Sequence, residues 1–203
     1  MNLVILTRHA HAASNATDVV SCLPPGEGLS ELGREQSLAL HHTLVREPIA
    51  LGVSTELLRT KETLEIALGG RDVPTLVLPD LNEIHFGSFE GGPLTDYRAW
   101  AWASEPDAQC PGGGESRASA AVRFARGLET LLARPEQSVL VVTHALPLRY
   151  VLDASDGSFP AARIERVEHA VPYRLARDRV ETAAETLRAW AEAPTFTDTP
   201  FGG

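Results

Sequence analysis

The chain has 203 residues, of which 43% are hydrophobic and 22% are charged, a composition typical of a soluble globular protein with one sizeable core. Its formal net charge of -9 argues against broad, sequence-independent binding of nucleic acid, which requires a basic face. No apolar stretch approaches membrane-spanning length, and the N-terminal apolar run is too short for a signal peptide, so we expect a cytoplasmic protein.

The predicted elements alternate between strands and helices. The first half of the chain is predicted to contain a strand at 3–7, a loop through 24–26, a helix at 30–46, a strand at 49–53, a helix at 54–69, a strand at 75–78, a loop at 81–92 and a helix at 95–103. The second half continues with a helix at 117–133, a strand at 139–143, a helix at 147–154, paired strands or a strand and a turn at 164–177, and a helix at 180–193. No linker divides the chain, so we expect one α/β domain over residues 1–193 and a tail at 194–203.

Two of the predicted strands end in histidines. The run at 3–7 leads into Arg8 and His9, and the run at 139–143 leads into His144. Continuous, β-branched runs of this kind are typical of parallel strands buried on both faces. Ligands bind outside the carboxyl ends of such strands, so we expect the two histidines to share one site. Arg8 indicates that the ligand of this site is anionic.

Five segments resemble, in the right order, the histidine phosphatase superfamily, which includes cofactor-dependent phosphoglycerate mutases and many small phosphatases. The segments are residues 6–11 with Asn15, 29–36, 54–63, 81–91 and 141–144. Their order along nearly the whole chain makes the resemblance specific. It implies a three-layer α/β/α sandwich with a mostly parallel central sheet and a small cap insertion at about residues 92–114.

The resemblance assigns the phosphate-binding groups. It implies that His9 attacks phosphorus and becomes transiently phosphorylated, which suits a neutral imidazole near pH 7. Arg8 and Arg59 can each donate forked hydrogen bonds to phosphate oxygens. His144, if protonated, adds a third cationic donor, and Asn15 adds an uncharged amide. Phosphoryl transfer needs mainly this positioning and charge neutralisation.

Glu83 matches the general acid of the family. It would protonate the leaving oxygen and then activate the water that hydrolyses phosphohistidine. A bound dianion beside this carboxyl should raise its pKa, because a like charge disfavours ionisation. Glu90 lies in the same loop and is the alternative acid. We prefer Glu83 as the acid and interpret Glu90 as a residue that orders the backbone.

The rim of the predicted pocket is less determined. His11 stands where the family usually has Glu or Gln and is either a substrate contact or a solvated loop residue. Tyr97, Trp100 and Trp102 fall in the segment that matches the cap, where Tyr97 and Trp100 are candidate substrate contacts and core or lid packing is the alternative.

Three alanines depart from the family pattern. Ala10 and Ala145 replace glycines that usually follow the two histidines, and Ala12 replaces a Thr or Ser. The added methyl groups at positions 10 and 145 would narrow the approach of the backbone to phosphate, and Ala12 removes one hydroxyl donor. No charged group is lost, so we expect activity with an altered substrate range or rate.

The function that these residues predict is a metal-independent phosphatase, without a cofactor, acting on a small phosphorylated substrate. Phosphoglycerate mutase activity is the first alternative. Against it, the chain is short and Arg98 is the only basic residue between Gly92 and Gly112. A non-catalytic protein that binds phosphorylated ligands and a phosphoprotein phosphatase are further alternatives. Cys22 and Cys110 lack metal-type spacing and are predicted to be free thiols, and a homodimer is left open.

Overall fold

A computed structural model describes residues 1–196 of the chain, and its centre is a five-stranded sheet. The strand order is β3-β2-β4-β1-β5. The strands are β1 (Leu3–Arg8), β2 (Leu51–Ser54), β3 (Thr75–Val77), β4 (Ser138–Thr143) and β5 (Tyr173–Ala176). All neighbouring strands are parallel except β5, which runs antiparallel to β1. The predicted, mostly parallel sheet is therefore confirmed.

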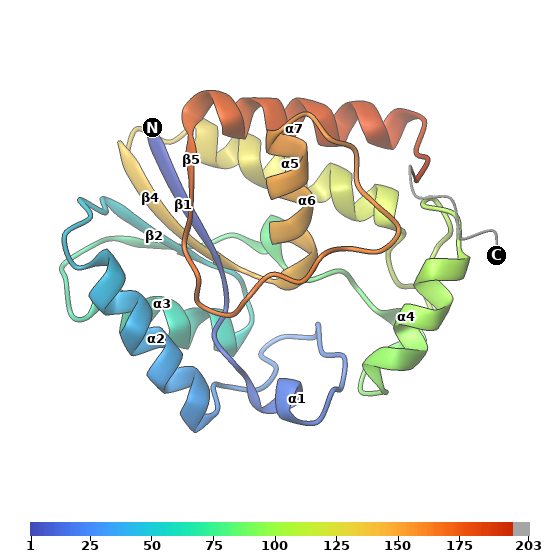
Figure 1. Cartoon of the computed structure of the whole chain (residues 1–203), viewed down its shortest axis with the longest axis horizontal. Helices are drawn as coiled ribbons and strands as arrows, with labels where there is room; N and C mark the ends of the chain where they lie inside the picture. The colour runs from blue at the N-terminus through green and yellow to red at the C-terminus, as the bar shows by residue number, and fades with distance from the viewer. Residues whose placement is uncertain (197–203) are drawn as a thin grey trace.

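Helices cover both faces of this sheet (Figure 1). One face carries α5 (Arg117–Leu132), α6 (Ala145–Ser155) and α7 (Arg177–Glu192), and the other carries α2 (Glu31–Leu44) and α3 (Leu58–Leu68). Successive residues of a strand point to opposite faces. Accordingly, Val4 and Leu6 join the core on the α5–α7 side, whereas Ile5 joins the core beneath α2 and α3. Burial on both faces explains why the strand runs are continuously apolar.

Local sequence signals determine several helix ends. The Ser30 hydroxyl accepts a hydrogen bond from Gly33 N at 3.1 Å and caps α2 as predicted. The Ser116 hydroxyl caps α5 in the same way through Ser119 N at 3.0 Å. Gly69 ends α3 in the left-handed conformation, with φ of 59°.

Two segments differ from the prediction. The loop after β1 contains one helical turn, α1 (Ala13–Ala16), stabilised because the Asn15 side chain accepts a hydrogen bond from Ala12 N at 2.9 Å. The predicted loop at 81–92 contains a 3-10 turn, η2 (Gly87–Phe89), and follows another, η1 (Pro79–Leu81). Of the two alternatives for residues 164–177, the strand and turn is observed, because only β5 joins the sheet there.

The remaining helix, α4 (Leu94–Ala103), lies beside the sandwich, within the segment expected to form a cap (Figure 1). At the other end of the chain, Trp190 Nε1 donates to Thr195 O at 2.8 Å, and the Phe196 ring packs against the Trp190 ring. The rest of the predicted tail, residues 197–203, lies outside the described residues. None of the helices within residues 1–196 is both long and apolar enough to cross a membrane.

Candidate active site

The two strand-borne histidines lie together at the carboxyl edge of the sheet. β1 and β4 are adjacent, and Arg8 pairs with Thr143 in the parallel register. His9 N donates to Thr143 O at 2.8 Å, which continues this pairing by one residue. The ring centroids of His9 and His144 are consequently 5.2 Å apart. Both side chains are buried, with 3% and 0% of their surface exposed.

Arg59, near the start of α3, contacts the rings of both His9 and His144. Its Nε donates to His9 Nε2 at 3.2 Å, and its Nη2 contacts His144 Nδ1 at 3.3 Å. A guanidinium has only donors, so both ring nitrogens must present lone pairs to it. The other nitrogens then carry the protons: His9 Nδ1 donates to Ala10 O at 2.7 Å, and His144 Nε2 donates to Thr55 Oγ1 at 2.9 Å. The two histidines thus have opposite tautomers, assigned from their partners.

Electrostatics keeps both rings neutral without a ligand. Burial is the main cause that lowers the pKa of His9 well below its usual value, and the Arg59 charge lowers it further. The same two causes, in the same order, lower the pKa of His144. A neutral His9 is a competent nucleophile. His144 is not a cationic donor in this state and would become one only when a bound anion raises its pKa.

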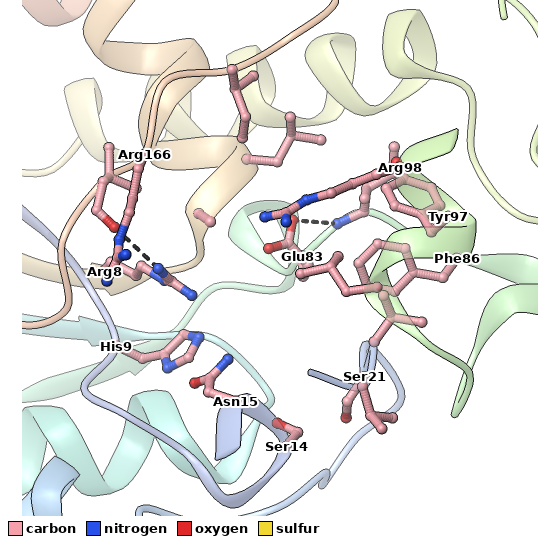
Figure 2. Close-up of a pocket in the computed structure, with 18 of the residues that line it drawn as sticks. Arg8, His9, Ser14, Asn15, Ser21, Glu83, Phe86, Tyr97, Arg98 and Arg166 are labelled. Carbon is pink, nitrogen blue, oxygen red and sulfur yellow. Dashed lines mark hydrogen bonds between the residues drawn. The ribbon is translucent and has the colours of Figure 1, made fainter. Parts of the chain in front are cut away.

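A cavity of about 370 Å³ opens beside these residues (Figure 2). Arg8, His9, Asn15 and Arg59 line it, whereas His144 lies behind them and does not. Arg8 Nη1 donates to Val167 O at 3.0 Å, and its Nε is buried with no hydrogen-bond partner in the described part of the chain. Burial lowers the pKa of Arg8 to about 10, which leaves the guanidinium charged at neutral pH. The Asn15 oxygen is occupied by Ala12 N, so its amide nitrogen is available to a ligand.

Glu83 lines the same cavity. Its Oε1 accepts a hydrogen bond from Ile84 N at 3.0 Å. Burial is the main cause that raises the pKa of Glu83, although this hydrogen bond and the charges of Arg59 and Arg8 oppose the increase. A raised pKa favours the protonated carboxyl that a general acid requires.

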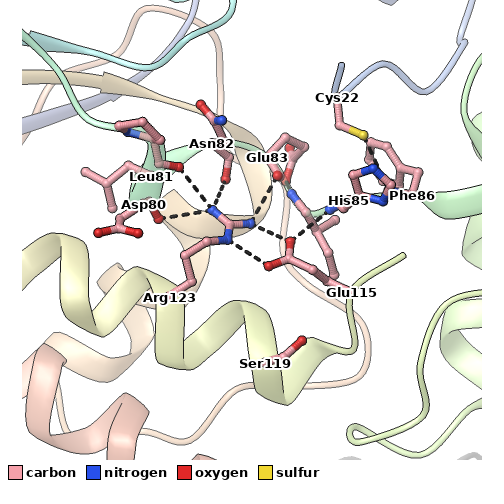
Figure 3. Close-up of polar contacts among 12 residues, drawn as sticks. Cys22, Asp80, Leu81, Asn82, Glu83, His85, Phe86, Glu115, Ser119 and Arg123 are labelled. Carbon is pink, nitrogen blue, oxygen red and sulfur yellow. Dashed lines mark hydrogen bonds and ion pairs between the residues drawn. The ribbon is translucent and has the colours of Figure 1, made fainter. Parts of the chain in front are cut away.

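A partly buried ion pair between Arg123 and Glu115 lies against the Glu83 loop (Figure 3). Arg123 Nη2 donates to the main-chain oxygen of Glu83 at 3.2 Å, and its Nη1 donates to Asp80 O and Asn82 O, each at 3.0 Å. Arg123 also pairs with Glu115 at 2.6 Å, and Glu115 accepts from His85 N at 2.9 Å. The loop therefore depends on Arg123 for its position.

Glu90 has a different environment from Glu83. Both of its carboxylate oxygens accept from Cys22 N at 3.0 Å, and one accepts from Leu23 N at 3.3 Å. The buried Cys22 thiol also donates to it at 3.0 Å. Glu90 does not line the cavity. These contacts describe a residue that orders the loop before α2.

Of the residues predicted at the rim of the pocket, only some line the cavity. Tyr97 lines the cavity, but Trp100 and His11 do not. The His11 ring is hydrogen-bonded through Nδ1 to Ser30 Oγ at 2.9 Å. It also packs against the His169 ring, with the ring centroids 5.6 Å apart. His169, which sequence reasoning did not single out, donates from Nδ1 to His9 O at 2.7 Å.

Sequence reasoning also missed several residues that surround the ligand space. Thr55 holds His144, and the cavity lining includes Ser14, Arg117 and Arg166. Trp102, one of the three aromatic residues already considered in the cap segment, also lines the cavity. One signal was available for Arg117, because a cation in the first turn of a helix opposes the helix dipole and calls for an explanation. Of the three alanines, Ala145 lines the cavity and Ala10 is buried, with its N–H donating to Thr63 Oγ1 at 3.0 Å.

Among the described residues, no group of three or more His, Cys, Asp or Glu side chains could hold a metal ion. The site instead combines a nucleophilic imidazole, converging guanidinium groups and a carboxyl of raised pKa. The family model for branch 1 of the histidine phosphatase superfamily matches residues 4–192. The chain belongs to this superfamily. It is thus a histidine phosphatase, an enzyme of phosphate-ester hydrolysis, as the sequence resemblance implied.

Individual relatives agree with this assignment. The chain is 33% identical over 150 residues to the adenosylcobalamin/alpha-ribazole phosphatase of Salmonella typhimurium, covering 68% of this chain and 72% of that protein. It is 31% identical over 159 residues to a metal-independent phosphoserine phosphatase of Arabidopsis thaliana, covering 73% of this histidine phosphatase and 66% of the relative. The crystal structure of the alpha-ribazole phosphatase from Shigella flexneri superposes with a TM-score of 0.73 and 25% identity, over 85% of this chain and 89% of that one.

Proposed function

We propose that this histidine phosphatase hydrolyses a small phosphate monoester, without a metal, through a phosphohistidine formed on His9. The observation that carries the proposal is the state of the two guanidinium groups beside His9. Arg8 Nε and Arg59 Nη1 are buried, and neither has a hydrogen-bond partner among the residues that the structure describes. No carboxylate in residues 1–196 forms an ion pair with either arginine. Buried cationic donors of this kind are suited to a phosphate dianion.

The first chemical step transfers the phosphoryl group to the enzyme. Oxygens of the bound phosphate accept from Arg8 and Arg59, which draws Arg59 Nε away from the His9 Nε2 lone pair. His9 Nε2 then forms a bond to phosphorus as the bond to the ester oxygen breaks. Glu83 gives its proton to that oxygen, and a neutral alcohol leaves.

The second step regenerates the enzyme. The Glu83 carboxylate takes a proton from a water molecule, whose oxygen attacks phosphorus as the P–N bond to His9 breaks. Inorganic phosphate is released and Glu83 is again protonated. His144 does not line the cavity, so in both steps it would act through its charge: once protonated in the field of the bound anion, it would add positive potential at the equatorial oxygens that the arginines contact.

The proposal also retains three expectations from the sequence: one domain over residues 1–193 with a cap at about 92–114, a cytoplasmic location, and no nucleic-acid partner. A homodimer stays open.

The central test is trapping of the intermediate. Wild-type enzyme in excess EDTA, mixed with ³²P-labelled phenyl phosphate and quenched in alkali, should carry an alkali-stable, acid-labile label. His9→Ala should abolish both label and hydrolysis, whereas His42→Ala, at an exposed position on α2, should leave both unchanged. Hydrolysis by His9→Ala at the wild-type rate would contradict the proposal.

The alternatives make different predictions in the same assays. A mutase would isomerise 3-phosphoglycerate while hydrolysing phenyl phosphate poorly, and this result would replace the phosphatase proposal. A binding protein would retain affinity for phosphate in His9→Ala and would have no activity to lose.

A further inference from the structure

Arg117 is a buried guanidinium that lines the cavity and has no role in the proposed chemistry. It is the first residue of α5, and 7% of its surface is exposed. Its Nη1 donates to the Tyr150 hydroxyl at 3.1 Å and to Ala162 O at 3.4 Å. Its Nε is buried without a partner, and no carboxylate within residues 1–196 pairs with it.

The positive charge of Arg117 has no anionic partner within residues 1–196, although the Phe196 ring also lies near it, with its centre 5.9 Å from the guanidinium carbon. A guanidinium stays protonated in proteins, and burying a charge is costly unless an opposite charge or full hydrogen bonding offsets the loss of water. The position of Arg117 adds to the imbalance, because the N-terminus of α5 contributes its own partial positive charge. An anionic group of a ligand would offset both the charge of Arg117 and the partial positive charge of the α5 N-terminus.

Two neighbouring side chains on α4 could bind the same anion. The Tyr97 hydroxyl is buried, lines the cavity and interacts with the Arg117 guanidinium, and it has no other hydrogen-bond partner within residues 1–196. Arg98 is exposed, lines the cavity and has no ion-pair partner among residues 1–196. A carboxylate or phosphate could therefore accept hydrogen bonds from a hydroxyl and from two guanidinium groups.

These donors are separated from the phosphate-binding residues. In Figure 2, the Tyr97 ring lies on the opposite side of the pocket from Arg8 and His9, and the Arg98 side chain extends from that side toward Glu83. Apolar side chains form much of the rest of the lining, including Ile84, Phe86, Leu94 and Leu146. The cavity thus offers two cationic ends and apolar walls.

The charge of the lining supports a second anion. The lining contains two glutamates, Glu83 and Glu165, and five arginines, of which Arg166 is exposed and paired with Glu168 at 3.1 Å, so four arginines remain without a carboxylate partner within residues 1–196. Glu165 is 85% exposed and lies 3.6 Å from Arg149, so it is screened from the cavity. A phosphate dianion alone leaves positive charge unbalanced in this lining. In the sequence, the low number of basic residues in the cap segment weighs against phosphoglycerate mutase activity, but Arg117 reaches the cavity from outside the cap.

We propose that Arg117, Tyr97 and Arg98 form a second anion subsite, and that the preferred substrate is a phosphate monoester whose alcohol portion carries a carboxylate or a second phosphate across an apolar spacer. This inference rests on the proposed function, since it assigns the phosphate ester to the His9 end.

The test compares esters that differ only in the distal charge. The substrates are 4-(carboxymethyl)phenyl phosphate, 4-(phosphonomethyl)phenyl phosphate and the neutral 4-(carbamoylmethyl)phenyl phosphate, in which a methylene insulates the phenol from the distal group. Wild-type kcat/KM for one of the two charged esters should exceed that for the neutral ester by about 10- to 100-fold, the usual effect of hydrogen bonds to a charged group. The charged ester that is preferred identifies the anion as carboxylate or phosphate.

Variants then assign the subsite. Arg117→Gln should reduce this ratio to near one while the neutral ester is still hydrolysed, whereas a merely structural role of Arg117 would lower all three rates alike. If Arg117→Gln does not fold, Tyr97→Phe and Arg98→Gln test the subsite in its place. Each should reduce the ratio of kcat/KM for the charged ester to kcat/KM for the neutral ester severalfold. Arg46→Gln, an exposed position after α2, is the matched control and should leave it unchanged.

A binding assay separates failure of the subsite from failure of the proposed function. The Kd values of benzylphosphonates bearing the same distal groups need no turnover, and should show the same preference. If the neutral ester is not hydrolysed but the binding preference holds, the proposed function fails and the subsite stands. A wild-type ratio near one in both assays, or a ratio that survives in all the folded variants, would overturn the subsite.

Discussion

Arg59 Nε donates to His9 Nε2 at 3.2 Å, so a guanidinium holds the lone pair that the proposed mechanism uses to attack phosphorus. The same guanidinium also contacts His144 and the Ser21 carbonyl oxygen. Arg59 therefore keeps both rings in a defined tautomer before the ligand arrives, and the phosphate must compete for it. This makes Arg59 the residue on which substrate binding and nucleophile activation depend together.

The first prediction concerns the shape of this group. Arg59→Lys keeps the charge, but an ammonium cannot contact both rings and two phosphate oxygens at once. We expect kcat/KM for phenyl phosphate to fall by roughly 100- to 1,000-fold, the usual cost of removing a donor to developing charge. Arg46→Lys, at an exposed position, is the control. Activity of Arg59→Lys within a few-fold of wild type would show that charge alone suffices.

The second prediction concerns proton transfer from Glu83. Burial raises the pKa of this carboxyl, so kcat/KM should fall as pH rises through that raised pKa, because the acid form is lost. Glu83→Gln should remove this pH dependence and lower kcat/KM for an alkyl phosphate by about 100- to 10,000-fold. The loss should be much smaller for p-nitrophenyl phosphate, whose leaving group needs no proton. Equal losses on both esters would exclude Glu83 as the general acid, and Glu35→Gln on the exposed face of α2 controls for charge.

The third prediction tests Arg123 as a positioning residue. Its hydrogen bonds to three main-chain oxygens fix the loop that carries Glu83, so Arg123→Met should displace the carboxyl. We expect kcat/KM for alkyl phosphates to fall by roughly 10- to 100-fold, and more than for p-nitrophenyl phosphate. Thermal unfolding will show a lower Tm as well. A purely structural role predicts that both esters lose activity equally.

The fourth prediction links the buried histidines to acid stability. The pKa values of His9 and His144 are lowered in the folded state, so below about pH 6.5 the unfolded chain binds protons that the folded chain does not. The free energy of unfolding should therefore decrease as pH falls from about 6.5, by up to about 1.4 kcal/mol per pH unit for each histidine. Urea unfolding at pH 7 and 5.5 measures this slope. His144→Gln should make the slope shallower, and His42→Gln, at an exposed site, should not.

Much of this site follows from local sequence. The continuous apolar runs identify β1 and β4 as buried strands, and their parallel order places His9 and His144 at one edge. Arg59 and Glu83 were found by resemblance alone, because an arginine in a helix or a glutamate in a loop has no periodicity that reveals its direction. The tautomers of the two rings were also inaccessible, since they depend on contacts from α3 and Thr55.

The substrate end of the cavity was harder to predict. Arg117, Arg166 and Tyr97 come from three separate segments, and what brings them to one cavity is the packing of α4, α5 and the chain after α6. The cap segment contains fewer basic residues than the substrate end of the cavity, because Arg117 and Arg166 come from outside the cap. Arg117 also illustrates how a locally unfavourable choice, a cation at a helix N-terminus, can mark a residue retained for binding.

The sheet order has a consequence for synthesis of the chain. β1 lies between β4 and β5, so β1 has no neighbour in the sheet until residues 138–176 have been translated. The nascent chain thus exposes an unpaired apolar strand through most of its elongation, and its slowest contacts to form join distant parts of the sequence. A truncated product ending before β4 would lack His144 and both partners of β1. Premature termination should therefore yield an aggregation-prone fragment rather than a weakly active enzyme.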